Sequence, residues 1–159
     1  MGLLLLMAAI SPGWISAQAS RDDGIRIGLA VGGISTVGVV VEFFDGNYGI
    51  DLTVGTWSFR DISVSAVGKR YVGDHAARPF LGLGLWLAAA NPPDGRQGFA
   101  LVLRAPVGLD WSVTDDHAIG AAVNVSKALW VRRTDPEDDL PLTGRIVPLP
   151  GAYYRWAKR

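Results

Sequence analysis

The sequence contains no cysteine in its 159 residues, which excludes disulfide bonds and cysteine-based metal sites. It has no charge excess either, because 15 basic and 15 acidic residues give a formal net charge of zero, and nothing therefore points to a nucleic-acid partner. No central stretch reaches the roughly 18 consecutive apolar residues of a transmembrane helix. Yet 49% of the residues are hydrophobic and 20 are glycine, so an apolar, glycine-rich chain without a membrane helix has to be explained.

The N-terminal residues have the layout of a secretory signal. An apolar run, Leu3 to Ile10, is followed by the small-residue pattern Ala17-Gln18-Ala19, just before the first charged residue, Arg21. No Lys or Arg precedes the apolar run, and a short N-terminal helix that stays in the protein is the alternative. The pattern predicts a cleavable signal peptide over residues 1–19 and one domain over residues 20–159.

Hydrophobic residues alternate with polar or small ones along most of the remaining chain. In the stretch FALVLRAPVGLDW, every second residue from Phe99 to Trp111 is apolar, whereas the intervening positions include Arg104, Gly108 and Asp110. A strand sends the two sets to opposite faces, and a helix would scatter both sets around its circumference. The apolar face is about as long as a tilted strand that crosses a bilayer, ~9–11 residues.

Seven other segments are predicted to be strands, with the last one interrupted by Pro148 and Pro150: residues 24–31, 36–44, 48–57, 61–69, 80–88, 118–131 and 145–156. Asp45-Gly46-Asn47 and Thr114-Asp115-Asp116 are tight-turn sequences, and the two longest polar connections precede the sixth and eighth strands. With a periplasmic N-terminus the long connections are external and the tight turns periplasmic, as in outer-membrane barrels.

The mixed face carries both the smallest and some of the largest side chains. Seven glycines and three tryptophans share it: Gly28, Gly38, Gly55, Gly82, Gly84, Gly108, Gly120, Trp57, Trp86 and Trp130. A narrow interior packed with small and large residues explains this mixture, with the apolar face turned to lipid. We therefore predict an all-β fold, an eight-stranded antiparallel up-and-down transmembrane β-barrel. A soluble lipocalin-like carrier of an apolar ligand is the alternative, and it would place glycine and tryptophan outside.

Charged residues on the mixed face are expected to form a network inside the barrel. Six of them, three basic and three acidic, fall in the periplasmic half: Arg26, Glu42, Asp51, Lys69, Asp110 and Arg155. Charges in a tight, poorly hydrated lumen must pair, because an isolated buried charge is too costly. The six are predicted to form a salt-bridged plug, and the alternative for each is a solvated position at the rim. An eight-stranded barrel is just wide enough for its side chains, so a diffusion pore is not expected.

The chain resembles the small eight-stranded outer-membrane β-barrel proteins, the OmpA-type transmembrane domain and its relatives. The leader, the stretch Lys69 to Ala88, the hairpin Ala105 to Val123 and the C-terminal segment carry the resemblance. It implies an outer-membrane location in a Gram-negative-type bacterium, and it implies little about activity, because the same fold serves as anchor, adhesin, enzyme or structural subunit.

The C-terminus reads GAYYRWAKR. Counting from Gly151, Tyr154 and Trp156 occupy alternate positions, which resembles the C-terminal signal read by the barrel assembly machinery. Their shared parity predicts that both rings face the lipid interface while Arg155 points inward. An accidental aromatic pair on a buried strand is the alternative.

No catalytic, cofactor or metal site is predicted. The two histidines, His75 and His117, fall on expected periplasmic turns, and neither belongs to a recognisable nucleophile-base arrangement. Two further charged groups have solvated alternatives: an acidic loop that would suit Ca²⁺ (Asp135, Glu137, Asp138, Asp139) and a rim group that would meet lipopolysaccharide phosphates (Lys127, Arg132, Arg133).

The sequence thus predicts a non-enzymatic outer-membrane barrel with a plugged lumen and a structural, anchoring or surface-interaction role. Its expected partners are outer-membrane lipids, including lipopolysaccharide, and the barrel assembly machinery. A lipid A-modifying outer-membrane enzyme remains the alternative from another functional class.

Overall fold

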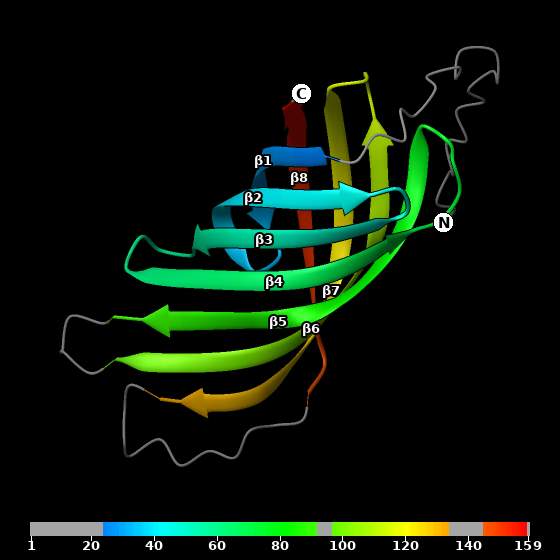
Figure 1. Cartoon of the computed structure of the whole chain (residues 1–159). Helices are drawn as coiled ribbons and strands as arrows, with labels where there is room; N and C mark the ends of the chain where they lie inside the picture. The colour runs from blue at the N-terminus through cyan, green and yellow to red at the C-terminus, as the bar shows by residue number, and fades with distance from the viewer. Residues whose placement is uncertain (1–23, 92–96, 134–144, 159) are drawn as a thin grey trace, which may run out of the picture.

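Eight antiparallel strands close into a single barrel in the computed structural model, which describes residues 24–91, 97–133 and 145–158 (Figure 1). Each strand pairs with its sequence neighbours, and β1 also pairs with β8. The strands are β1 (Gly24–Gly32), β2 (Ser35–Asp45), β3 (Tyr48–Thr56), β4 (Asp61–Tyr71), β5 (Ala77–Ala90), β6 (Gly98–Ser112), β7 (His117–Arg132) and β8 (Val147–Lys158). The predicted all-β, eight-stranded antiparallel fold is confirmed. The predicted signal peptide lies outside the described residues, none of which form a helix long and apolar enough to cross a membrane.

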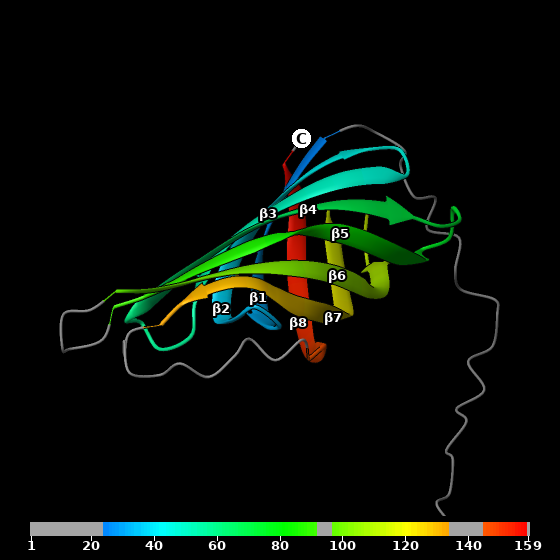
Figure 2. The same cartoon turned by 90° about the horizontal axis from the view of Figure 1, so that it is seen from below.

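The two ends of the barrel differ. The terminal end holds Gly24, Lys158 and the connections over residues 46–47, 72–76 and 113–116. The loop end holds the connections over residues 33–34 and 57–60, the ends of β5 and β7, and the starts of β6 and β8. Strands β5 to β7 have 14 to 16 residues and β1 and β3 have nine, so the wall is uneven. Figure 2 shows the ends of β5, β6 and β7 projecting at the loop end beyond the β1–β2 turn.

The apolar face of each strand points outward. On β5, Leu83 is 62% exposed, and on β3 the exposed Ile50 and Leu52 flank the buried Asp51. Glu42, Lys69 and the other predicted luminal charges point into the barrel. This arrangement matches the predicted assignment of faces and is the reverse of what the soluble carrier alternative requires.

Interior glycines make room for large luminal side chains. A Cβ added to Gly28 would lie 2.7 Å from Cγ of Arg155, and one added to Gly49 would lie 2.8 Å from Oε1 of Glu42. A Cβ at Gly120 would overlap the ring of Tyr153. The small-and-large packing predicted for the interior is therefore present, with arginine, glutamate and tyrosine as the large members.

Of the three tryptophans predicted to face inward, one faces outward and another lies beyond the end of its strand. Trp57 lies beyond the end of β3 and is 42% exposed. Trp130 pairs with the outward-facing Leu101, because Ala128 pairs with Val102 and the intervening Leu129 is an extra residue in β7. Such a bulge reverses the alternation beyond it, so Trp130 falls on the outer face. Trp86 keeps the inward parity on β5.

The two prolines of β8 lie before the point where β8 begins to pair with β1. The carbonyl of Pro150 accepts a hydrogen bond from the backbone N–H of Gly33 at 2.7 Å, so this residue turns its backbone polar groups toward β1. Pairing between β1 and β8 starts only at Gly32 and Gly151. Pro148, two residues earlier, turns the same way, beyond the end of β1. The missing N–H groups therefore cost no ladder bond, and β8 runs through both prolines.

The β1–β2 turn packs into the barrel. Gly33 has a positive φ of 69°, and the following Ile34 and Ser35 are 3% and 0% exposed. Ile34 lines a small luminal cavity together with Val40 and Pro106. The β1–β2 turn thus contributes to the core at the loop end.

Candidate functional site

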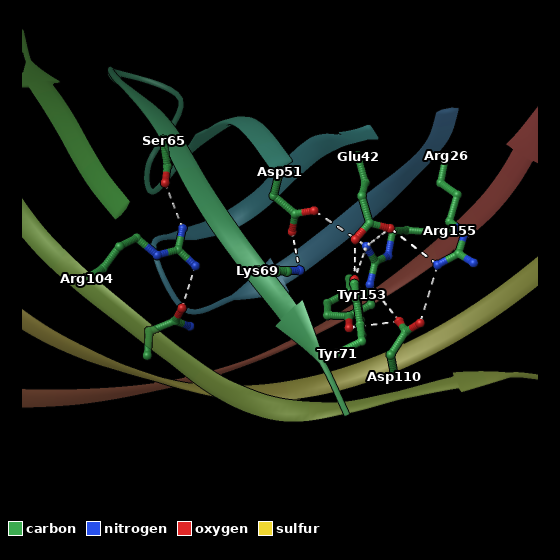
Figure 3. Close-up of polar contacts among 11 residues, drawn as sticks. Arg26, Glu42, Asp51, Ser65, Lys69, Tyr71, Arg104, Asp110, Tyr153 and Arg155 are labelled. Carbon is green, nitrogen blue, oxygen red and sulfur yellow. Dashed lines mark hydrogen bonds and ion pairs between the residues drawn. The ribbon is translucent and has the colours of Figure 1, made fainter. Parts of the chain in front are cut away.

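The structure brings the six predicted luminal charges together in one ion-pair network in the half of the barrel nearer the terminal end (Figure 3). Each comes from a different strand, because successive strands pass the same level of the lumen with their inward positions. The network consists of Arg26 (β1), Glu42 (β2), Asp51 (β3), Lys69 (β4), Asp110 (β6) and Arg155 (β8).

Arg155 is the centre of the network and is fully buried. Its Nη1 pairs with Glu42 and lies 3.5 Å from Oδ1 of Asp51, and its Nη2 lies 2.6 Å from Oδ1 of Asp110. One guanidinium therefore meets three carboxylates from three strands. A planar group with five donors suits this arrangement, since a lysine would offer a single point charge.

Two further cations complete the carboxylate contacts. Nη1 of Arg26 lies 3.4 Å from Oε2 of Glu42 and 3.5 Å from Oδ2 of Asp110, and Lys69 pairs with Oδ2 of Asp51. Every carboxylate in the network thus meets at least two cations. This pairing offsets the desolvation cost that isolated charges would carry in the lumen.

Two tyrosines belong to the same network and were not singled out from the sequence. The hydroxyl of Tyr71 donates to Oε1 of Glu42, and the hydroxyl of Tyr153 donates to Oδ1 of Asp110 at 2.9 Å. The Tyr153 ring also lies 4.0 Å from Cζ of Arg155, in a cation–π arrangement. The sequence could have identified them by strand alternation, because each tyrosine occupies an inward position between outward-facing neighbours on β4 or β8.

Arg78 and Arg104 also point inward and were missing from the predicted set. Arg78 lies opposite Asp110 in the β5–β6 register, with its Nη2 4.0 Å from Oδ2 of that residue and its guanidinium over the Tyr71 ring. Arg104 lies nearer the loop end, where it donates to Oγ of Ser65 at 2.9 Å and to Oδ1 of Asn124. Strand parity places both arginines inside, but their partners depend on how the strands are staggered.

Two spaces lie beside these groups. A cavity of about 50 Å³ lies among Thr53, Phe80, Arg104, Asn124 and Tyr153, with Ile34 of the inward turn in its wall. A second space, of about 340 Å³, opens at the loop end between Trp57, Ser63, Ala88, Phe99 and Arg132.

A groove of about 550 Å³ crosses the outer face of β3 to β5 near the terminal end. Its floor is Gly68, where an added Cβ would meet nothing closer than 3.9 Å. Exposed side chains of Ile50, Leu81 and Leu83 form its walls, and Arg70 stands at its side toward the terminal end.

The C-terminal aromatic residues face outward. Tyr154 and Trp156 are 42% and 37% exposed, with ring centroids 6.0 Å apart, and Gly151 pairs with Gly32 of β1. The hydroxyl of Tyr154 lies 2.7 Å from Nδ1 of His117, and the imidazole ring of His117 stacks on the Tyr154 ring. The outward orientation matches the predicted parity, and the assembly role stays a prediction.

The two histidines lie at the terminal end of the barrel, on separate elements. His75 is exposed in the β4–β5 connection, and the ring of His117 contacts Tyr154. The described residues contain no group of three or more His, Asp or Glu arranged to hold a metal. The acidic loop with Asp135, Glu137, Asp138 and Asp139 lies outside the described residues.

The barrel is similar to a solved structure, the N-terminal β-barrel domain of OprF from Pseudomonas aeruginosa, with a TM-score of 0.65. The similarity covers 86% of this chain and 98% of that domain at 12% sequence identity. No family model matches the chain, and no curated protein matches it significantly. The chain therefore has the fold of the small eight-stranded barrels of OmpA type, as its sequence resemblance implied.

Proposed function

We propose that this protein is a non-enzymatic outer-membrane β-barrel with a lumen closed by its ion-pair network and a structural, anchoring or surface-interaction role. In this assignment the terminal end lies in the periplasm and the loop end faces outward. The short connections then lie on the periplasmic side and the long ones outside, as in outer-membrane barrels.

One observation carries the proposal: the barrel is apolar outside and charged inside. Leucine, isoleucine and valine side chains cover its outer surface, whereas the buried polar residues include Glu42, Asp110 and Arg155. In water this outer surface would be an exposed apolar patch far larger than monomeric proteins carry. In a bilayer the same surface is solvated, and strands of nine or more residues are long enough to cross.

The side chains that fill the lumen support a structural role over transport. Seven charged side chains and two tyrosines fill the half nearer the terminal end: Arg26, Glu42, Asp51, Lys69, Arg78, Asp110, Arg155, Tyr71 and Tyr153. The cavity beside them, about 50 Å³, has room for one or two waters at about 30 Å³ each. Such a layer would leave a solute larger than water no path through the barrel.

Lipids and the assembly machinery are the proposed partners. The groove over Gly68 would seat an acyl chain of the periplasmic leaflet, with Arg70 at the headgroup level. Lys127, Arg132 and Arg133 at the loop end would meet lipopolysaccharide phosphates. Tyr154 and Trp156 suit the interfacial aromatic girdle, and with Gly151 they would form the assembly signal.

The non-enzymatic assignment is supported by the position of His117. Its ring is engaged by Tyr154 on the outer surface at the terminal end, which is the periplasmic side in the proposed orientation. A lipid A-modifying site would need its base at the other leaflet. Mass spectra of lipid A from cells with and without the protein test this point, and a mass difference between them would contradict the assignment.

Fractionation tests the membrane location. The protein should stay with outer membranes through high-salt and alkaline washes and should migrate differently on gels with and without heating. Release by salt or alkali would contradict the proposal. Osmotic swelling of vesicles that contain the refolded barrel tests the closed lumen separately, since swelling in small sugars would show an open pore.

A further inference from the structure

Small residues on the outer face of β4 lead from Arg70 toward the middle of the strand. β4 lies between β3 and β5, and the next two outward positions after Arg70 are Gly68 and Ala66 (Figure 1). The residues opposite these two on the neighbouring strands are all large, apolar and exposed: Ile50, Leu52, Leu83 and Leu85. The groove over Gly68 is therefore bounded by large side chains on both sides, and its low floor continues along β4.

Two opposite charges line the same groove at its end nearer the connections. Asp45 of β2 and Arg70 of β4 lie on either side of Tyr48 in the strand register. Cζ of Arg70 lies 5.9 Å from the centre of the Tyr48 ring, so the guanidinium leans over β3. Neighbouring strands are about 5 Å apart, which places the Cα atoms of Asp45 and Arg70 roughly 10 Å apart. Both charged groups can therefore reach one ligand that lies over Tyr48.

Neither of these exposed charged side chains has a charged partner in the described part of the chain. The side chain of Asp45 forms no ion pair or hydrogen bond there, and that of Arg70 has only the aromatic contact with Tyr48. Lys69 also lines the groove, but its ammonium group pairs with Asp51 inside the barrel. The groove thus offers one available cation and one available anion at its end, next to an apolar channel.

We propose that this groove binds one phospholipid with an ethanolamine headgroup, with the phosphate on Arg70, the ammonium beside Asp45 and an acyl chain over Gly68. The inference rests on the proposed membrane location and specifies the lipid at this groove. A guanidinium suits phosphate oxygens, and a primary ammonium has N–H groups to donate to a carboxylate. A choline headgroup has no such N–H group, and a glycerol headgroup carries no positive charge, so Asp45 disfavours both.

Native mass spectrometry of the detergent-refolded barrel tests the proposal with three lipids of identical acyl chains: phosphatidylethanolamine, phosphatidylcholine and phosphatidylglycerol. The wild type should bind phosphatidylethanolamine roughly two- to tenfold more tightly than the other two, which corresponds to one additional hydrogen bond. Asp45→Ala should remove this preference, and Arg70→Met should weaken binding of all three lipids. Arg60→Met removes an exposed arginine from the β3–β4 connection at the loop end and should bind lipid as the wild type does.

Two results of this experiment would overturn the proposal. One is equal binding of the three lipids by the wild type, or a preference that survives Asp45→Ala. The other is a dimer without bound lipid, which would assign the groove to a second copy of the chain.

Photocrosslinking covers the case in which a variant does not fold. Wild-type barrel in vesicles should be labelled around the groove on β3 to β5 by phosphatidylethanolamine that carries a photoreactive acyl chain. Labelling spread evenly around the barrel would overturn the proposal. A barrel that stays in washed outer membranes but shows no lipid preference would contradict this inference alone, whereas release by alkali would contradict the proposed function.

Discussion

Gly28 and Arg155 lie directly opposite each other where the first strand meets the last. A Cβ at Gly28 would lie 2.7 Å from Cγ of Arg155 and would also overlap the carbonyl oxygen of Tyr154. Because Gly28 has no side chain, the Arg155 side chain can lie against the inner face of β1. Gly28 therefore has a specific role beyond the high glycine content of the chain. The β1–β8 pairing that closes the barrel also makes room for the central residue of the ion-pair network.

Removing the central cation should destabilise the barrel strongly. Arg155→Met leaves Glu42, Asp51 and Asp110 with fewer cations in a buried site, and breaking a buried ion pair on one side costs about 3–5 kcal/mol. Urea unfolding of the refolded barrel measures the loss. Arg70→Met on the outer face is the control and should change stability by less than about 1 kcal/mol. Equal effects at both positions would contradict the central role of Arg155.

Alanine should be tolerated at one glycine and not at another. Gly28→Ala forces the new methyl group into Arg155 and the backbone of β8, so a loss of about 1–3 kcal/mol is expected. Gly68→Ala meets nothing closer than 3.9 Å and should stay within about 0.5 kcal/mol of the wild type. The two free energies of unfolding check the prediction, and a larger loss at Gly68 would refute it.

A charged residue on the outer face should lower the stability of the barrel more, the deeper it lies in the bilayer. Leu83 is 62% exposed in the middle of β5, and Leu83→Arg should cost about 2–4 kcal/mol in phospholipid vesicles. Val113 is half exposed in the β6–β7 connection, where Val113→Arg should cost only about 0–1 kcal/mol. Similar costs at the two positions would mean that the surface around Leu83 does not contact the hydrocarbon core.

The C-terminal aromatic residues should matter more for assembly than for final stability. Replacing Tyr154 and Trp156 together by alanine should lower the amount of assembled, heat-modifiable barrel in cells severalfold. Trp111 is an outward aromatic residue at the same end of the barrel but on β6, so Trp111→Ala is the control and should assemble normally. Equal defects in both variants would assign these rings to the lipid girdle alone.

Period-two alternation predicted the eight strands and the direction of most side chains, because a strand places alternate residues on opposite faces regardless of its neighbours. The same local rule failed at Trp130. The extra residue Leu129 reverses the alternation there, and a bulge depends on the pairing with β6. Pro148 and Pro150 suggested an interruption of the last strand, but β8 runs through both. Their missing N–H groups are tolerated because they lie where β1 has ended, which also depends on strand pairing.

The luminal network shows where sequence reasoning stops. Parity and the cost of burying charge were sufficient to group the six residues. They did not assign Tyr71 and Tyr153 to Glu42 and Asp110, because these contacts join β4 to β2 and β8 to β6. Such pairings depend on how far each strand is shifted along its neighbour, which no single strand encodes.

The position of Arg155 on the last strand has a consequence in time. Seven strands without β8 contain Glu42, Asp51 and Asp110 but not the guanidinium that meets all three. Without it, Glu42 and Asp51 would each keep a single ion-pair partner among the described residues. Pairing of β8 with β1 and β7 therefore closes the barrel and brings this guanidinium to all three carboxylates in the same event.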